Sequence, residues 1–140
     1  MRHLPIAAAL ALVAACAQQP SGDDSLYQDL GGKAGITRIV EGMLLNIAGD
    51  PRIVEHFRNI DIERLRDKLV EQFCVEAGGP CRYTGDSMEE SHKGQQLTES
   101  DFNALVEDLQ DAMDAEGIAS RTQNRLLARL APMRGQVIHK

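Results

Sequence analysis

Aromatic residues are scarce in this sequence: they make up 4% of its 140 residues, and there is no tryptophan. Aliphatic side chains must therefore supply most of any core. The hydrophobic content of 43% is sufficient for a packed domain rather than a disordered chain. No stretch shows the strict two-residue alternation typical of strands, and no internal repeat is visible. We therefore expect a single all-α domain.

A positive net charge and several well-known motifs are also lacking. The formal net charge is −6, which would repel the phosphates of nucleic acid, so we expect no nucleic-acid partner. The sequence contains no C-x-x-C-H motif, no glycine-rich phosphate loop and no H-E-x-x-H motif. A hydrolytic triad is not evident either. These absences argue against covalent haem attachment through cysteines, nucleotide binding and zinc-dependent hydrolysis.

The first 24 residues have the composition of an export segment rather than of a folded domain. A short basic start precedes an apolar stretch from Leu4 to Ala15, which is too short to span a bilayer. Its end, Val13-Ala14-Ala15-Cys16, resembles a bacterial lipobox. This resemblance implies a signal peptide at 1–15, lipidation of Cys16 and a tether at 16–24 that holds the protein at the periplasmic face of a membrane. The alternative is an ordinary signal peptide cut nearby, with Cys16 left as a thiol.

Export would change the interpretation of the two remaining cysteines, Cys74 and Cys81. In an oxidising compartment such a pair is a candidate disulfide, here between the end of a helix and the loop that follows it. The alternative is two buried thiols that never pair.

Apolar residues recur at helical spacing from Ser25 onward and predict several helices of unequal length. Five polar residues are expected to cap helices, namely Ser25, Asp50, Asp61, Ser87 and Thr98. Glycine pairs and Gly-Pro combinations are expected to end helices, and Pro132 should divide the last one. The predicted helices lie at 25–30, 33–48, 51–56, 61–77, 87–92, 98–117 and 119–138. The inner face of the helix at 61–77 is expected to carry Ile62, Leu65, Leu69, Val70 and Phe73, with Lys68 on its flank.

His92 is the candidate ligand in this pattern. It follows Met88 by one turn in a helix that is too short to be stable alone, so the helix must be held by packing or by a ligand. A single inward histidine is more often a core residue with satisfied hydrogen bonds than a metal ligand. No Asp, Glu or Cys has the spacing to complete a protein-only metal site around it. A metal at His92 would take most of its ligands from elsewhere, and a porphyrin supplies four.

A set of short motifs, taken together, resembles the group I truncated haemoglobins of bacteria. The resemblance covers Ser25 to about Ile138 and implies a truncated globin domain at 25–140, a two-over-two helical sandwich around haem b. It implies that His92 is the proximal iron ligand, that Phe57 packs on the haem, and that Met88 and Tyr83 lie in the cofactor pocket. The motifs are Leu26-Tyr27-x-x-Leu30-Gly31-Gly32, Asp50-Pro51-Arg52, His56-Phe57, Gly78-Gly79-Pro80 with Tyr83 and Gly85, and Met88-x-x-Ser91-His92.

The resemblance fails on the distal side of the implied haem. The family commonly has a Phe-Tyr pair where this chain has Met43-Leu44, and Gln or His among the positions of Leu65, Lys68 and Leu69. The distal cofactor-binding residues would then be Leu44, Leu65, Lys68 and Leu69. A distal pocket without hydrogen-bond donors is expected to release O₂ quickly and to affect CO less.

Two polar residues could still act near the iron. The Lys68 amine is a candidate sixth ligand; alternatively, its stem follows the pocket while its ammonium lies in water or pairs with a haem propionate. Ser91 stands where the family usually has Ala, and its hydroxyl is expected to add a contact beside His92.

The resemblance therefore implies a haem protein that binds a diatomic gas, O₂, CO or NO, for transport, delivery or sensing. One alternative is a haem redox enzyme, an NO dioxygenase or a peroxidase-like protein, with a reductase that the sequence does not identify. The apolar distal side argues against it, because both reactions use distal polar groups. A further alternative is a helical lipoprotein without a cofactor.

Overall fold

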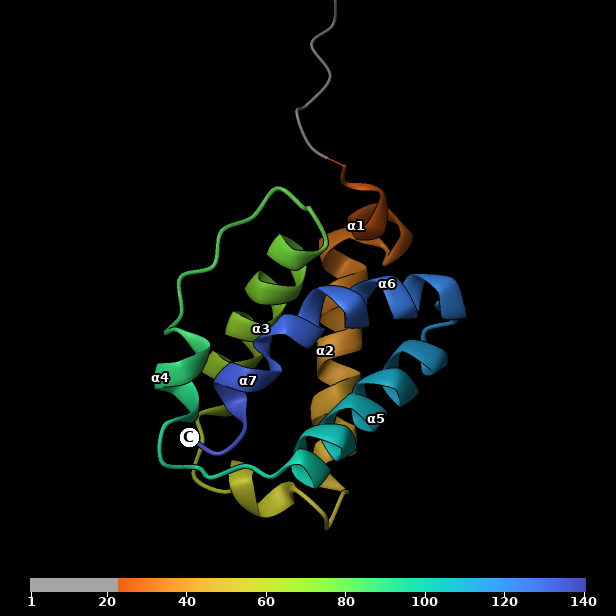
Figure 1. Cartoon of the computed structure of the whole chain (residues 1–140). Coiled ribbons are helices and arrows are strands. Elements are labelled where there is room, and N and C mark those ends of the chain that lie inside the picture. Colours follow the sequence, from red (N-terminus) through yellow and green to blue (C-terminus); the bar gives the residue numbers. More distant parts are fainter. Residues whose placement is uncertain (1–22) are drawn as a thin grey trace, which may run out of the picture.

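The computed structural model describes residues 23–140, and their regular structure is helical (Figure 1). The predicted signal peptide, Cys16 and most of the predicted tether lie outside these residues. Within 23–140, no helix is both long enough and apolar enough to cross a bilayer. The elements are α1 Ser25–Asp29, α2 Gly32–Ala48, the 3₁₀ helix η1 Val54–Phe57, α3 Ile62–Glu76, α4 Met88–His92, α5 Glu99–Ala115, α6 Ser120–Leu130, the 3₁₀ helix η2 Ala131–Met133 and α7 Arg134–Val137.

Three of the five predicted helix caps are confirmed. Ser25 and Asp50 do not cap helices, because Asp24 occupies the N-cap position of α1 and Ile53 that of η1. The side chain of Asp61 accepts a hydrogen bond from the Arg64 amide at the start of α3, and Ser87 does the same for Glu90 at the start of α4. Thr98 forms a capping box with the third residue of α5. Each cap satisfies an amide that has no partner inside its helix. The caps therefore fix the points at which α3, α4 and α5 begin.

Proline sets two further boundaries. Pro132 ends α6 at Leu130, as predicted, and the chain continues through η2 into α7. After Pro51 the helix begins later than predicted, at Val54 and as a 3₁₀ helix. The reason is local, because the Asp50 carboxylate accepts hydrogen bonds from the backbone and guanidinium of Arg52 and holds 50–53 as a turn.

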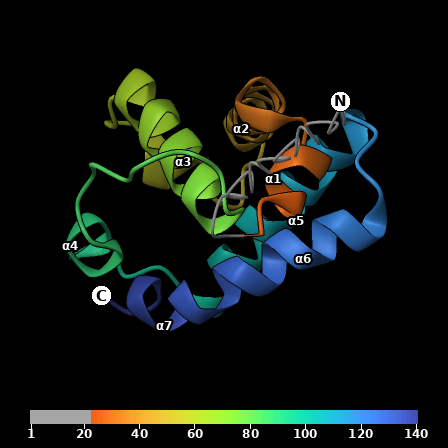
Figure 2. The same ribbon diagram turned by 90° about the horizontal axis from the view of Figure 1, so that it is seen from above.

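The long helices form two layers, with α2 and α3 in one and α5 and α6, continued by the short α7, in the other (Figures 1 and 2). Between them lies an aliphatic core, as the shortage of aromatic residues required. A Cβ at Gly42 would lie 3.3 Å from the Ala112 Cβ, so the absence of a side chain there lets α2 and α5 approach closely. The most buried large side chains of the core are those of Leu30, Ile36, Ile39, Val40, Met113 and Leu126.

The end of the chain closes one side of this arrangement. Ile138 forms a parallel bridge with Leu97, and the His139 amide donates to the Leu97 carbonyl at 2.9 Å. The Gln96 amide donates to the Lys140 carbonyl at the same distance. These bonds attach the C-terminus to the segment that follows α4, where Figure 1 shows the two lying side by side.

A pair of buried carboxyl groups lies at the α2–α5 interface. Asp50 and Asp108 are both buried, and Asp108 Oδ2 has no hydrogen-bond partner within residues 23–140. Hydrogen bonds from Arg52 lower the pKa of Asp50 to about 2. Burial and the neighbouring Asp50 raise the pKa of Asp108 to about 6. One of the two carboxyl groups therefore holds a proton over part of the ordinary pH range.

Candidate functional site

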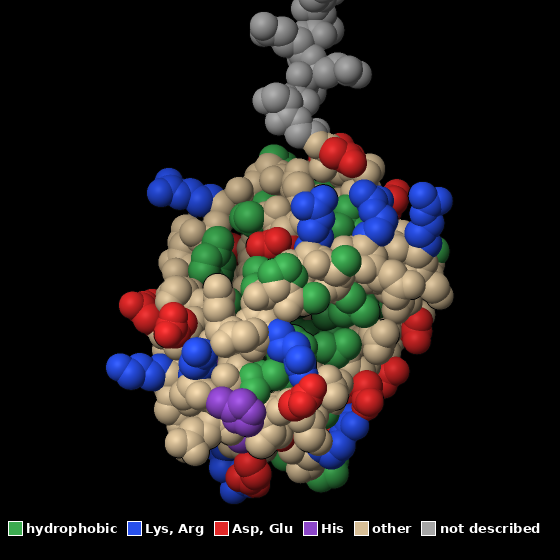
Figure 3. Space-filling view, in the orientation of Figure 1, with side chains coloured by type: hydrophobic (Ala, Val, Ile, Leu, Met, Phe, Trp, Pro, Cys, Tyr) green, Lys and Arg blue, Asp and Glu red, His purple; other side chains and the backbone are tan. Residues whose placement is uncertain are grey.

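A large cavity lies between α3 on one side and α4, α5 and the α6–α7 segment on the other. Its volume is about 630 Å³, within the range of pockets that enclose whole small molecules. Figure 3 shows hydrophobic side chains gathered around a hollow in the middle of this face. Apolar side chains dominate the walls, among them Met43, Phe57, Leu65, Leu69, Phe73 and Phe102.

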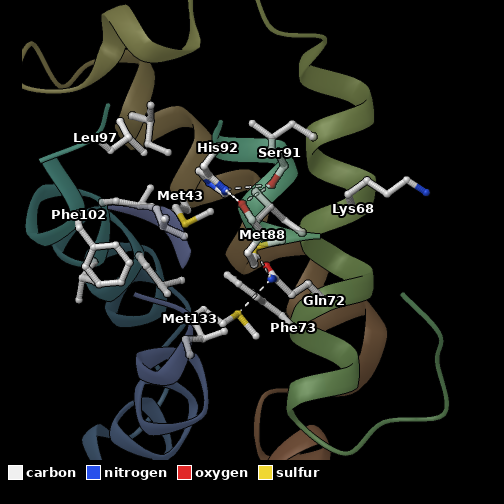
Figure 4. A pocket seen from close by; sticks show the side chains of 18 of the residues that line it. Met43, Lys68, Gln72, Phe73, Met88, Ser91, His92, Leu97, Phe102 and Met133 are labelled. Atoms are coloured by element: carbon white, nitrogen blue, oxygen red, sulfur yellow. Dashed lines mark hydrogen bonds between the residues drawn. The ribbon is translucent and has the colours of Figure 1, made fainter. Parts of the chain in front are cut away.

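His92 points into this cavity from the end of α4 (Figure 4). Its Nδ1 lies 2.7 Å from the Met88 carbonyl and 2.9 Å from the Ser91 hydroxyl oxygen. A neutral imidazole in this position carries its proton on Nδ1 and donates it to the carbonyl, which leaves the lone pair of Nε2 for a ligand. The predicted contact between Ser91 and His92 is confirmed.

Four other predicted site residues line the cavity together with His92. Leu65 and Leu69 enter from α3, Phe57 from η1 and Met88 from α4. Their apolar side chains restrict water around the imidazole. These five predicted residues are therefore brought together, although they come from three separate elements.

Tyr83 also lines the cavity, from the loop between α3 and α4. Its hydroxyl donates to the Asp86 carbonyl at 2.6 Å, and burial raises the pKa of Tyr83. The phenol is therefore held in its neutral form, with its proton directed to the loop.

The structure differs from the prediction at Leu44. This side chain lines a smaller neighbouring pocket of about 240 Å³ with Val54 and Ile62, whereas Met43 lines the main cavity. Adjacent residues on a helix point about 100° apart, so only one of the two can face the cavity. Met43 shares its face with buried Ile39 and Ile47, and Leu44 is turned toward η1.

Lys68 contributes its stem to the cavity wall but directs its ammonium away from it (Figure 4). The Nζ atom lies 3.4 Å from Glu71 Oε1 and donates to the Thr84 hydroxyl. Glu71 also accepts the Thr84 backbone amide at 2.9 Å, which lowers the pKa of the Glu71 carboxyl. The geometry favours the arrangement in which the stem packs on the pocket and the charge lies outside it. The partner is Glu71, not water alone.

Cys74 and Cys81 form a disulfide in the structure. Cys74 is buried in the last turn of α3, while Cys81 is exposed in the loop that leads to α4. A Cβ at Gly79 would lie 2.4 Å from the Tyr27 ring and 2.7 Å from Cys74 Sγ, so only glycine fits between them. The loop is therefore attached to α3 at one point by the disulfide and at another by Glu71 and Thr84.

Sequence reasoning missed Gln72. Its side chain is buried, lines the cavity from α3, and directs its amide nitrogen toward two methionine sulfurs. The spacing could have revealed it, because residue 72 follows Leu65 by seven positions and Leu69 by three, on the same helical face. Gln72 is polar, however, so a pattern of apolar residues on that face does not include it.

The residues present fit a planar apolar cofactor that brings most of its own metal ligands. Within 23–140, no group of three or more His, Cys, Asp and Glu side chains could hold a metal ion by itself. The cavity instead offers one nitrogen ligand, His92, between apolar walls. A basic group on its lining, at Arg64, suits a carboxylate of a porphyrin. All-helical layers around such a cavity define a globin-type protein.

The comparison with protein families agrees with this class. A model of the bacterial-like globin family matches residues 25–139, and the chain belongs to this family. Membership implies that the chain binds haem, and globins generally bind diatomic gases.

The individual relatives are truncated haemoglobins. A group 1 truncated hemoglobin of Mycolicibacterium paratuberculosis is 31% identical over 113 residues, which cover 81% of this chain and 83% of the relative. One from Nostoc sp. is 28% identical over 116 residues, covering 83% and 98%. The Fe(III) crystal structure of the Tetrahymena pyriformis truncated hemoglobin superposes with a TM-score of 0.80 at 25% identity and covers 82% of this chain and 98% of its own. The fold is thus the all-α, two-over-two truncated-globin fold.

Proposed function

We propose that this chain binds haem b in the cavity through His92 as the axial iron ligand and that it serves to bind a diatomic gas, O₂, CO or NO. The observation that carries this proposal is the single histidine directed into an apolar cavity, with Nδ1 bonded to Met88 and Nε2 available. When bound, haem supplies an iron with one coordination position for the protein and one for a gas. The similarity to group 1 truncated haemoglobins supports the same assignment.

The side chains of this protein would have distinct tasks in that complex. The Met88 carbonyl and the Ser91 hydroxyl hold the imidazole in one tautomer and one orientation. Leu65, Leu69 and Phe57 exclude water from the same space. An aqueous ion would be poorly solvated there, whereas a small apolar gas is not penalised. These properties favour gas binding over a reaction that needs distal acids or bases.

Lys68 would act as a sixth ligand only after leaving Glu71 and losing its proton. The stem of the Lys68 side chain already lies along the cavity, so rotation about its bonds would bring the amine toward the interior. The ion pair with Glu71 opposes that movement. We propose that the ammonium stays with Glu71 and Thr84, which leaves the gas side open.

We also propose that the protein is exported and attached to the periplasmic face of a bacterial membrane through Cys16. The support is the sequence of residues 1–24, with its apolar stretch and lipobox-like ending. The disulfide between Cys74 and Cys81 fits an oxidising compartment.

The decisive experiment is an optical spectrum of the purified chain with haem, ferric and ferrous, with and without CO. A Soret band that moves on adding CO to the ferrous protein is expected. His92→Gly should lose most of its haem affinity, and added imidazole should restore the ferrous spectrum by replacing the missing ligand. His56→Ala is the matched control, since His56 pairs with Asp101 and does not line the cavity. Unchanged haem affinity and an unchanged ferrous spectrum in the His92 variant would exclude His92 as the ligand.

A further inference from the structure

The side-chain amide of Gln72 joins three elements at the bottom of the cavity (Figure 4). Gln72 lies on α3 and is only 8% exposed. Its Nε2 donates to the sulfur of Met88 on α4 at 3.1 Å and to the sulfur of Met133 in η2 at 3.3 Å. Thioether sulfur is a weak acceptor, so this arrangement is unusual for a buried amide. A leucine would fill the same space without removing an amide from water.

Met88 connects this amide to His92. Its side chain accepts from Gln72, and its backbone carbonyl lies 2.7 Å from His92 Nδ1. The two contacts are made by one residue, so holding the Met88 side chain also limits the positions open to the carbonyl that orients the imidazole.

The helix between these contacts cannot hold itself in place. α4 has five residues, fewer than an isolated helix needs in water. Its Ser87 cap fixes where it begins but not how deeply it sits or how it is rotated. A directed side-chain contact from a long helix, α3, can fix both. Met133 adds the α6–α7 connection to the same amide, so α4 is held against two walls of the cavity.

We propose that Gln72 is a positioning residue for the haem ligand: through Met88 it fixes the depth and rotation of α4 and so aims the His92 imidazole into the cavity. The part of this inference that concerns iron rests on the proposed function. The part that concerns the order of α4 does not.

The test uses Gln72→Leu, Met88→Leu and the double variant of the full chain. Gln123→Leu is the matched control, because Gln123 is also buried and donates to Asp114 at 2.7 Å and to the Ile118 carbonyl at 3.0 Å, but outside the cavity. One readout is hydrogen exchange of the 88–92 amides in the haem-free protein. The other is the iron–histidine stretching band in the resonance Raman spectrum of the ferrous, haem-bound protein.

In Gln72→Leu, the 88–92 amides should exchange about threefold to tenfold faster, the range expected for loss of one hydrogen bond. The iron–histidine band should broaden, because the imidazole then samples more than one orientation. Met88→Leu should reproduce both effects, and the double variant should add little to either single variant. Gln123→Leu should lower global stability while leaving the band and the relative exchange of 88–92 unchanged.

Two outcomes would overturn the inference. In one, Gln72→Leu matches the wild type in both readouts while His92→Gly abolishes the iron–histidine band; the proposed function then stands without this role. In the other, Gln72→Leu and Gln123→Leu change both readouts equally, which would make Gln72 an ordinary core residue. A wild-type chain that binds no haem would instead refute the proposed function, and the exchange measurement would still decide whether Gln72 holds α4. If Gln72→Leu does not fold, Met88→Leu removes the same contact from the other side.

Discussion

Reducing the Cys74–Cys81 disulfide should destabilise the fold by an amount that the chain length between the cysteines determines. The two residues are seven apart in sequence. A bond across so short a loop restricts the unfolded chain by about 2–3 kcal/mol in the chain-entropy treatment. A double substitution would be less clean than reduction, because Cys74 is 3% exposed and alanine there would also lose packing worth about 1 kcal/mol.

The measurement is urea unfolding of the haem-free protein with and without a phosphine reductant, followed by far-ultraviolet circular dichroism. The oxidised form should exceed the reduced form by about 2–3 kcal/mol in free energy of unfolding. Cys74→Ala/Cys81→Ser is the control and should not respond to reductant at all. Hydrogen exchange should show the largest change in 78–87, with a smaller change in α4, because Glu71 still holds Thr84 when the bond is broken.

Equal unfolding free energies for the oxidised and reduced forms would refute this reasoning, provided that mass spectrometry shows the bond in the oxidised sample. Two free thiols in the protein purified without reductant would refute the pairing itself.

Three further predictions concern the Asp50–Asp108 carboxyl pair, the close packing at Gly79 and the side chain of Lys68. Burial and Asp50 raise the pKa of Asp108 from 3.8 to about 6, so the folded chain keeps a proton that the unfolded chain releases. Stability should therefore fall as pH rises from about 4 to about 6, and Asp108→Asn should remove this fall and add about 1–3 kcal/mol at neutral pH in urea unfolding; a variant with the same pH profile as the wild type would contradict the assignment. Gly79→Ala should cost about 1–3 kcal/mol because its Cβ would overlap the Tyr27 ring, and an unchanged melting temperature would show that the ring moves aside without cost. The ferric haem spectra of Lys68→Ala and of the wild type should be the same at each pH from neutral to alkaline. A low-spin alkaline form present only in the wild type would show that the Lys68 amine reaches the iron.

Local sequence signals predicted the helix boundaries well, because they depend on neighbouring residues. Asp61, Ser87 and Thr98 satisfy amides within three residues of themselves, so their caps could be read from the sequence. Pro132 likewise divides the last helix by its own geometry. The all-α fold followed from helical spacing, and the order of the motifs indicated the family.

Contacts between elements were harder to predict, and the site errors lie there. The choice between Met43 and Leu44 depends on the rotation of α2 against η1 and α3. Ile62, expected on the inner face, is 46% exposed and lies at the smaller pocket with Leu44 rather than at the main cavity.

Polar partners far along the chain are invisible to a helical pattern. Gln72 meets sulfurs that lie 16 and 61 residues away in sequence. Asp50 and Asp108 likewise meet only after α2 and α5 have packed.

The bridge between Leu97 and Ile138 also constrains the order in which the protein is assembled. Those two residues are about 40 positions apart, so their contact closes a long loop late in folding. The segment that follows His92 forms hydrogen bonds with His139 and Lys140, which come after all the helices described above in the chain. α4 therefore lacks part of its support until these residues have been synthesised, so we expect haem to be held stably only after that point. Any group attached at Lys140 would lie beside the segment that follows α4, whose His92 is the proposed iron ligand.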